Sequence, residues 1–534
     1  MSRMAVGCLL LASLARAEPD RAKEIDAYLA RCERFGFSGS VLVLRDKKPV
    51  IERGCGLADR ERGERAAPDT VFEIASATKP FTACAILKLA EMKKLSLDDP
   101  IGKHLPDVPK DKQGITIRHL LSHTSGMSRM GGGGGGDAAA AARSYLSKPL
   151  ARKPGEAFEY WNGGYALLAA IVEQASGQSY MDFCRERLFR PAGLENTGFT
   201  GDADLAKQAV GYDGGQPVRQ AAGHPYGDYG FQYRGMGGIV TSVQDLRRFL
   251  DAYENGTILS AQSRELMETS VTKNYGLGWG MAETKRGTLR IGHGGDVRGF
   301  HAEIERFPKE RAAVLVLCNV EGIPLWTIAW NLEALLFGEA PPYPMPPAAV
   351  DLPPEALDRL AGRYGDVLVE RQGNGLLVRG GPAAKFAKEI AAAEAVVEAV
   401  RRGDAKPVAA VLMEGIPKSW PTTLVKMIWP GHVERFGELK EAKTLGASEL
   451  SPGRVRVLLE LRHEKGTPCL EIVFQKGRLN IFRLDATREG VGTFYLPTGP
   501  SKFTGFSWDG EQPPPLRFEG EELVLPGVRA RRSP

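Results

Sequence analysis

The chain has 534 residues, of which 43% are hydrophobic and 25% charged, a composition typical of a soluble globular protein large enough for two or three domains. Its formal net charge of +5, from 70 basic and 65 acidic residues, is too small to indicate a nucleic-acid-binding surface, and no basic run is interleaved with aromatic residues. Beyond the first residues, no apolar run is long enough to span a bilayer.

The N-terminus has the pattern of an export signal. Arg3 supplies a positive start, residues 4–14 are apolar, and Ala15-Arg16-Ala17 has the small-x-small form that signal peptidase cleaves. We therefore expect residues 1–17 to be a signal peptide and the protein to be exported, either periplasmic or secreted. The alternative is a short buried helix that stays on the protein.

The seven cysteines are scattered, and none forms a close pair with the spacing of metal ligands. In an oxidising compartment some of them could form disulfides, and the sequence does not define which. Cys84 and Cys318 lie in apolar runs, so we expect both to be buried free thiols. The sequence contains no His-x-His or His-Glu-x-x-His motif, so we predict no metal centre and no other cofactor.

The first hundred residues predict helices and strands in alternation. Residues 21–34 predict a helix, and the apolar segments 39–45 and 49–54 flank a polar turn, as in a β-hairpin. A second helix is expected from Ser76 to about Lys94, because apolar residues recur there at helical spacing.

Strands return after a loop-rich middle region. The glycine run 131–136 indicates a surface loop, since ordering six glycines costs much conformational entropy. Strands at both ends of the region, with helices between them, predict an antiparallel sheet built from distant segments. The late strands, and the helix that closes them, are expected at 275–281, 288–292, 300–307, 312–318 and 324–337.

A Pro-rich stretch at 339–354 predicts a linker and a domain boundary. The region beyond it, 355–534, has an α+β pattern and carries no catalytic motif. Its expected strands and its one Ala-rich helix are at 367–369, 455–461, 470–475, 479–484 and 386–402.

Ser76-Ala77-Thr78-Lys79 is a Ser-x-x-Lys motif at a predicted helix start. The spacing of three places both side chains on one helix face. A serine hydroxyl becomes a good nucleophile when a neighbour accepts its proton, and a lysine can do so if burial lowers its pKa. A second match, Ser270-Val271-Thr272-Lys273, shows how weak the motif is alone; the alternative for either is an N-capping serine beside a solvated lysine.

Two further elements favour the functional interpretation of Ser76. Tyr160-Trp161-Asn162 precedes a predicted helix, and a phenol beside a lysine can share its proton while an amide can hold a substrate carbonyl. His293-Gly294-Gly295 follows the predicted strand 288–292, and its glycines allow a substrate backbone to lie along the strand edge. Tyr253-Glu254-Asn255 has the same Tyr-x-Asn form but lies at the polar end of a helix.

In this order the three motifs resemble those of the serine β-lactamase and D-alanyl-D-alanine peptidase (penicillin-binding) superfamily, most nearly its class C branch and esterase relatives. The stretches 117–127, 191–194 and 276–280 also fit, so the resemblance spans 24–337. It implies an α/β (α+β) fold of the β-lactamase/transpeptidase type over residues 18–338, with a central antiparallel sheet flanked by helices.

The resemblance also implies roles for the motif residues. Ser76 would form an acyl-enzyme, and Lys79 would take its proton. Tyr160 would be the general acid/base that also serves deacylation, and Asn162 would bind the amide oxygen of the substrate. Backbone N–H groups of Ser76 and of Asp296 would form the oxyanion hole.

The chain departs from the family where a Lys-Thr-Gly motif is usual. His293 and Gly295 would line the site from the edge strand, but a histidine is mostly neutral at pH 7 and gains charge toward pH 6. Arg298 could supply the missing cation by pointing into the cleft; the alternative is a solvated hairpin residue. For His119 and His123 we expect structural hydrogen bonds rather than catalysis.

These expectations describe a serine hydrolase acting on amide or ester bonds of a small-molecule or short-peptide substrate, most like a D-alanyl-D-alanine carboxypeptidase or β-lactamase-related peptidase. An esterase on the same scaffold and a non-catalytic binding protein are the alternatives, and three intact motifs argue against the binder. Residues 355–534 would form a β-rich accessory domain, in which 360–364 resembles the first strand of a small lipocalin-like barrel and 381–485 a cystatin-like insertion.

Overall fold

A computed structural model describes residues 18–533, with gaps at 128–135, 203–204, 214, 223–229, 273, 366, 380–385, 415, 417, 452–453, 487–492, 507, 509–511, 514 and 526–527. The expected signal peptide, Cys8 and most of the glycine run 131–136 lie outside the described residues. The chain divides into two units, one up to residue 342 and the other from 343 to 534, with 214–216 grouped with the second.

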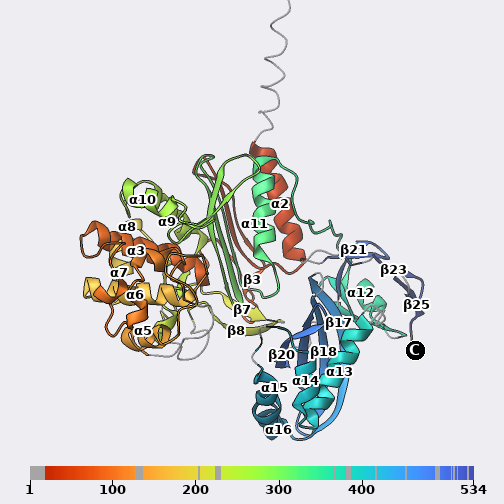
Figure 1. The fold of residues 1–534 in the computed structure, drawn as a ribbon. Coiled ribbons are helices and arrows are strands. Elements are labelled where there is room, and N and C mark those ends of the chain that lie inside the picture. Colours follow the sequence, from red (N-terminus) through yellow and green to blue (C-terminus); the bar gives the residue numbers. More distant parts are fainter. Residues whose placement is uncertain are drawn as a thin grey trace, which may run out of the picture. The chain divides into compact units, whose positions relative to one another are not determined.

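The first unit is built on a six-stranded antiparallel sheet (Figure 1). The N-terminal hairpin pairs with the late strands, from Gly39 opposite Cys318 to Arg45 opposite Ala312. The predicted antiparallel sheet of sequence-distant segments is thereby confirmed. In order across the sheet, the strands are β10 (Gly280–Glu283), β11 (Leu289–Val297), β12 (Phe300–Phe307), β13 (Ala312–Cys318), β1 (Gly39–Arg45) and β2 (Lys48–Cys55).

Helices cover both faces of this sheet (Figure 1). α2 (Glu18–Arg34) and α11 (Leu325–Phe337) lie side by side on one face, and a larger helical region lies on the other. That region contains α3 (Lys79–Glu91), α4 (Ile117–Leu121), α5 (Ala138–Leu146), α6 (Asn162–Ser176), α7 (Tyr180–Cys184), α8 (Arg190–Ala192), α9 (Val243–Glu254) and α10 (Ala261–Glu268).

Short strands link the helical region to the sheet. β9 (Ile239–Thr241) lies between β5 (Phe72–Glu73) and β6 (Gly198–Phe199), which brings the chain just before Ser76 beside residues far along the sequence. The remaining short strands are β3 (Leu57–Asp59), β4 (Glu64–Arg65), β7 (Val210–Asp213) and β8 (Gln216–Gln220).

α3 forms the centre of the helical region, because almost all of its side chains are buried. Phe81 stacks on Phe249 of α9, with ring centroids 3.8 Å apart, and meets Phe189 edge-on. Burying one such ring stabilises the fold by about 1.5–3 kcal/mol. The helix that carries Lys79 is therefore fixed by the core rather than by solvent-exposed contacts.

Two element boundaries differ from the sequence-based expectation. β10 begins at Gly280 rather than at residue 275, and β11 continues to Val297, so His293-Gly294-Gly295 lies within a strand rather than after one. The reason is pairing: β12 matches β11 as far as Val297 opposite Phe300, which holds the glycines in extended conformation. β10 pairs with β11 only as far as Gly292.

The second unit contains an eight-stranded antiparallel sheet and, between its third and fourth strands, an inserted four-stranded sheet with helices. The two sheets have separate apolar cores. The larger sheet comprises β14 (Gly362–Tyr364), β15 (Val367–Gln372), β16 (Gly375–Arg379), β21 (Thr493–Gly499), β22 (Lys502–Gly505), β23 (Leu516–Glu519), β24 (Glu522–Leu525) and β25 (Val528–Arg531). The smaller comprises β17 (Leu439–Ser451), β18 (Arg454–His463), β19 (Cys469–Gln475) and β20 (Arg478–Ala486).

The helices of this unit are α12 (Pro354–Leu360), α13 (Ala387–Arg401), α14 (Ala405–Ala410), α15 (Trp420–Thr423) and α16 (Trp429–Phe436). Across the described parts of both units, six cysteines are buried free thiols, among them Cys84 and Cys318 as predicted. None of the described helices has both the length and the apolar character needed to cross a membrane.

Candidate active site

Ser76 lies on a single 3₁₀ turn, η1 (Ala75–Thr78), immediately before α3. The preceding residue, Ala75, has a φ of 44°, in the left-handed region that a residue with a Cβ rarely adopts. Holding a non-glycine residue there costs about 1–3 kcal/mol, and such strain is concentrated at functional sites. Ser76 is therefore presented by a strained turn, not by the regular helix that the sequence predicted.

Lys79 is completely buried beside Ser76. Its Nζ lies 2.9 Å from Ser76 Oγ and donates to the backbone carbonyl of Met236 at 3.1 Å. Burial disfavours the ammonium form and holds the pKa of Lys79 well below its usual value. A neutral amine at this distance can accept the Ser76 proton while the Met236 carbonyl orients it.

β11 packs directly against the turn that carries Ser76. A Cβ on Gly295 would lie 2.0 Å from Ile74 O and 3.0 Å from Ala77 N, so no other residue fits there without displacement. Asp296 follows Gly295 on the strand, with its side chain mostly exposed and hydrogen-bonded to His301. The backbone of β11 next to Asp296 is therefore held close to the backbone of η1, as an oxyanion hole made by both requires.

Tyr160 lies next to the amine of Lys79. The centroid of its ring is 4.8 Å from Lys79 Nζ, and the ring of Tyr165, in the first turn of α6, is 5.6 Å from the same atom. Asn162 is the first residue of α6 and is exposed. The structure thus brings Ser76, Lys79 and Tyr160 together and leaves Asn162 at a solvent-accessible helix end.

His293 is buried at the edge of the site and is neutral. Its Nδ1 lies 2.6 Å from the carbonyl O of Gly294 and must donate, so its Nε2 accepts from the Tyr275 hydroxyl at 3.2 Å. Burial, and then the nearby Lys79, lower the pKa of His293 to about 3. The expectation that His293 gains charge near pH 6 is therefore wrong.

Arg298 does not supply a free cation to the site. Its Nε forms an ion pair with Asp213 Oδ2 at 2.8 Å, and its side chain is 53% exposed. Of the two alternatives, the structure matches the solvated hairpin residue rather than an arginine pointing into the cleft. Pairing with a carboxylate far away in the sequence was not predictable from the local pattern.

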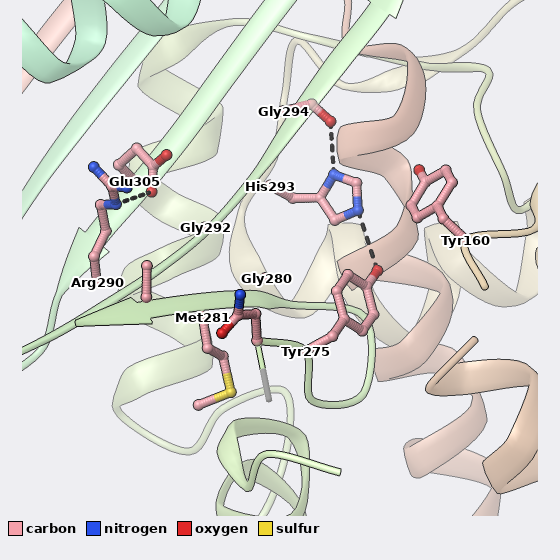
Figure 2. Close-up of a pocket in the computed structure, with 11 residues that line it drawn as sticks. Tyr160, Tyr275, Gly280, Met281, Arg290, Gly292, His293, Gly294 and Glu305 are labelled. Carbon is pink, nitrogen blue, oxygen red and sulfur yellow. Dashed lines mark hydrogen bonds and ion pairs between the residues drawn. The ribbon is translucent and has the colours of Figure 1, made fainter. Parts of the chain in front are cut away.

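A cavity of about 310 Å³ adjoins these residues (Figure 2). Tyr160, Tyr275 and His293 form one wall, and Arg290 and Glu305 lie beyond the strand edge on the other side. Gly280 of β10 and Gly292 of β11 line the cavity between these two sides. The lining of the cavity is Tyr160, Asn274, Tyr275, Gly280, Met281, Ala282, Arg290, Gly292, His293, Gly294 and Glu305.

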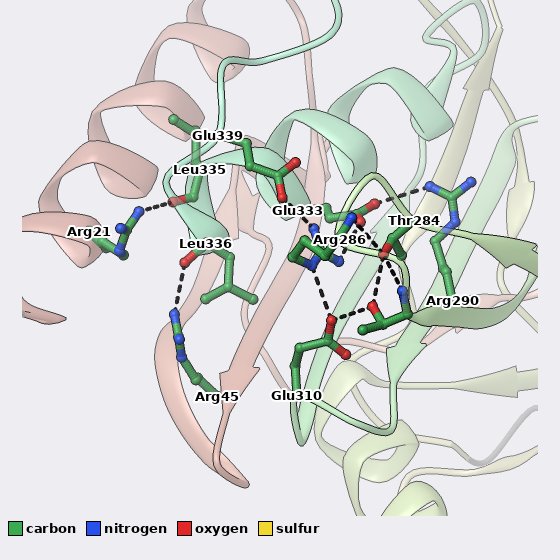
Figure 3. Close-up of polar contacts among 11 residues, drawn as sticks. Arg21, Arg45, Thr284, Arg286, Arg290, Glu310, Glu333, Leu335, Leu336 and Glu339 are labelled. Atoms are coloured by element: carbon green, nitrogen blue, oxygen red, sulfur yellow. Dashed lines mark hydrogen bonds and ion pairs between the residues drawn. The ribbon is translucent and has the colours of Figure 1, made fainter. Parts of the chain in front are cut away.

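Arg290, the cation in this lining, is already neutralised (Figure 3). It forms ion pairs with Glu333 of α11 at 3.1 Å and with Glu305 at 3.8 Å, and it lies over the ring of Trp330. Arg286 binds the same Glu333 at 2.8 Å, which ties the β10–β11 hairpin to α11. This arginine pair serves the packing of α11, and the described lining of the cavity contains no unpaired guanidinium.

The other sequence motifs lie outside this cluster. Tyr253 of the second Tyr-x-Asn is buried against Trp279, Ser270 of the second Ser-x-x-Lys is exposed, and Lys273 falls outside the described residues. His119 caps α4 in a reciprocal pair with Thr116, which is the predicted structural role.

Sequence reasoning missed Met236, Tyr275 and the contacts of His123. Met236 acts through its backbone carbonyl, which a side-chain pattern does not reveal; the Gly-x-Gly-Gly around it was the available signal. His123 Nδ1 accepts from the backbone N–H of Trp161, inside the Tyr-x-Asn motif. Over the described residues, no group of three or more His, Cys, Asp or Glu side chains could hold a metal ion.

Comparison with known proteins identifies the family of the first unit. Residues 22–336 match the family model described as Beta-lactamase. The chain is 33% identical over 268 residues to the putative penicillin-binding protein PbpX of Bacillus subtilis, covering 49% of this chain and 66% of that protein. It is 28% identical over 373 residues to penicillin-binding protein 4* of the same organism, covering 62% of this chain and 80% of that protein.

Among solved structures, the octameric penicillin-binding protein homologue from Pyrococcus abyssi has a similar fold, with a TM-score of 0.54 at 24% identity. The match covers 86% of this chain and 99% of that one. Since the family model spans more than half of the residues, including the cluster around Ser76, the chain belongs to the β-lactamase family of serine hydrolases.

Proposed function

We propose that the protein hydrolyses ester or amide bonds through an acyl-enzyme on Ser76, with Lys79 as the general base. The observation that carries this proposal is the 2.9 Å contact between Ser76 Oγ and a fully buried Lys79 amine whose pKa is lowered. A structural lysine normally keeps its charge in solvent or in an ion pair. Lys79 is shielded from solvent, and among the described residues its amine contacts the Ser76 hydroxyl and the Met236 carbonyl rather than a carboxylate.

In the acylation step, Ser76 Oγ bonds to the acyl carbon as its proton passes to Lys79 Nζ. The negative charge on the substrate oxygen is taken by backbone N–H groups of Ser76 and Asp296. The proton returns through Tyr160 to the leaving nitrogen or oxygen as that bond breaks. In deacylation, a water oxygen bonds to the acyl carbon as its proton passes to the same base. The bond between Ser76 Oγ and the acyl carbon then breaks, Oγ takes that proton, and the acid product leaves.

The charges around the cavity favour neutral substrates. His293 stays neutral, Arg298 is paired with Asp213, and Arg290 is paired with Glu333 and Glu305. A substrate carboxylate would find no unpaired cation in the described wall of the cavity. We therefore place small neutral esters and amides first.

A D-alanyl-D-alanine carboxypeptidase is the second candidate. The relatives named penicillin-binding proteins support it. A peptidase of this kind must bind a free C-terminal carboxylate, so the two candidates differ in the charge that the site must accommodate.

The test uses wild type, Ser76→Ala and Ser270→Ala. We expect wild type and Ser270→Ala to be labelled by a fluorophosphonate probe and to turn over p-nitrophenyl acetate, while Ser76→Ala does neither but unfolds at the same temperature. A D-alanyl-D-alanine peptide and nitrocefin in the same panel separate the two candidate substrate classes. Labelling that survives in Ser76→Ala would remove the proposed nucleophile.

We also propose that the protein is exported, on the strength of the signal-like residues 1–17. Expression with and without these residues, followed by cell fractionation, tests this proposal. Equal retention of both forms in the cytoplasm would contradict it.

A further inference from the structure

His123 lies in the loop that follows α4 and is 2% exposed. Its φ of 57° places the backbone in the left-handed region, which a residue with a Cβ adopts at a cost. The conformation turns both the carbonyl and the ring of His123 toward one segment, the chain around Tyr160.

His123 holds that segment on both sides of Tyr160. The backbone N–H of Glu159 donates to the carbonyl O of His123 at 2.8 Å, and the backbone N–H of Trp161 donates to its Nδ1 at 3.1 Å. The ring of Tyr160 itself lies against the imidazole, with centroids 4.3 Å apart and an angle of 36°. One residue therefore contacts Tyr160 and both of its neighbours.

The hydrogen bond from Trp161 fixes the protonation of this ring. Because Nδ1 accepts, the proton of a neutral imidazole must lie on Nε2, and that atom is buried with no hydrogen-bond partner in the described part of the chain. The titratable groups around the His123 ring are Lys79, His293, and the hydroxyls of Tyr160, Tyr165 and Tyr275. Burial, with Lys79 and His293, keeps the pKa of His123 well below its usual value, so the acceptor persists.

We propose that His123 is a positioning residue whose neutral imidazole, by accepting from Trp161 N–H, sets the phenol of Tyr160 against the amine of Lys79. This inference rests on the acyl transfer proposed above, and it assigns His123 no contact with the reacting atoms. A buried ring that leaves one N–H unpaired is a costly way to fill space. The hydrogen bond that Nδ1 accepts from Trp161 N–H offsets part of this cost.

The test separates the acceptor from the ring. In His123→Asn, the side-chain carbonyl can accept from Trp161 N–H, but the aromatic ring is lost. In His123→Phe, the ring remains and the acceptor is lost. His119→Ala is the matched control, because it removes a nearby histidine, in the first turn of α4, that caps this helix.

For each variant, kcat and KM for p-nitrophenyl acetate are measured per active site titrated with a fluorophosphonate. We expect kcat of His123→Phe to fall at least roughly 10²-fold, the cost of misplacing a catalytic group by about 1 Å, with KM changed much less. His123→Asn should stay within about tenfold of wild type, and His119→Ala should keep wild-type kcat while unfolding at a lower temperature.

Equal kcat in the Asn and Phe variants, whether high or low, would overturn the inference. A change in His123→Phe that affects KM and leaves kcat unchanged would also overturn it. If His123→Phe does not fold, the Asn variant decides alone: retained kcat supports the acceptor role, and a loss beyond about tenfold overturns it. Wild type is measured first, because absence of labelling at Ser76 there would defeat the proposed function itself. Labelled, active wild type with indifferent His123 variants would defeat this inference alone.

Discussion

Substitution of Gly295 by alanine tests whether β11 must contact the turn that carries Ser76. The new Cβ would lie 2.0 Å from Ile74 O, and restoring an ordinary contact of 3.4 Å requires about 1.4 Å more separation. Both neighbours are backbone, so the strand or the turn must move. A displacement of about 1 Å at a catalytic group costs about 10²-fold in rate, or about 2.7 kcal/mol. We therefore expect Gly295→Ala to lower kcat/KM by about that factor.

Gly294→Ala is the matched control on the opposite face of the same strand. Its Cβ would meet Glu303 Oε1 at 3.0 Å and Oε2 at 3.2 Å, the flexible end of a side chain that can give way. We expect it to cost much less activity. Hydrolysis of p-nitrophenyl acetate measures kcat/KM, and thermal unfolding shows whether the fold is kept. If folded Gly295→Ala had the kcat/KM of wild type, or lost no more kcat/KM than Gly294→Ala, the close approach of β11 to the turn would not matter for catalysis.

Tyr160→Phe should keep the fold and lower kcat by roughly 10²-fold or more, since it removes the proton that the proposed mechanism uses in acylation and deacylation; unchanged single-turnover deacylation would reduce Tyr160 to a packing role. Arg298→Ala should change kcat/KM by less than about threefold for carboxylate-bearing and neutral substrates alike, because its charge is already paired with Asp213 at a half-exposed position. The ratio of the two substrate rates should also be flat between pH 5 and 7, because His293, with a pKa of about 3, stays neutral throughout; a carboxylate preference that grows toward pH 5 would show that it titrates in this range.

The proximity of Ser76 and Lys79 was predictable from the sequence because the information for it is local. Three-residue spacing at a helix start is enough to place Ser76 and Lys79 together, and the structure gives their distance as 2.9 Å. The sheet was predictable for a similar reason, because apolar strands flanked by turns are recognisable from the local sequence pattern. The end of β11 was not, because glycines have low strand propensity and are extended here by pairing with β12.

The electrostatics of the site depended on long-range burial and could not be read from the pattern. Burial and the nearby Lys79 lower the pKa of His293, and Lys79 is more than two hundred positions away in the sequence. Arg298 was equally ambiguous until Asp213 was located beside it. His123 was expected to be structural, and its hydrogen bond to Trp161 fits that expectation while linking it to the segment of Tyr160.

These observations together show what changes at the strand edge when a histidine stands where the resembled family usually has lysine. A lysine at position 293 would bring a second amine near Lys79, and its positive charge would favour a neutral Lys79 and offer a cation to a substrate carboxylate. A neutral His293, held by the Gly294 carbonyl and the Tyr275 hydroxyl, keeps the strand edge in place without adding charge. The ring of His123, which is also neutral, packs against the ring of Tyr160. Both imidazoles remain uncharged, so burial rather than a neighbouring positive charge holds the pKa of Lys79 low. The described part of the site therefore lacks the fixed cation that a carboxylate substrate would need.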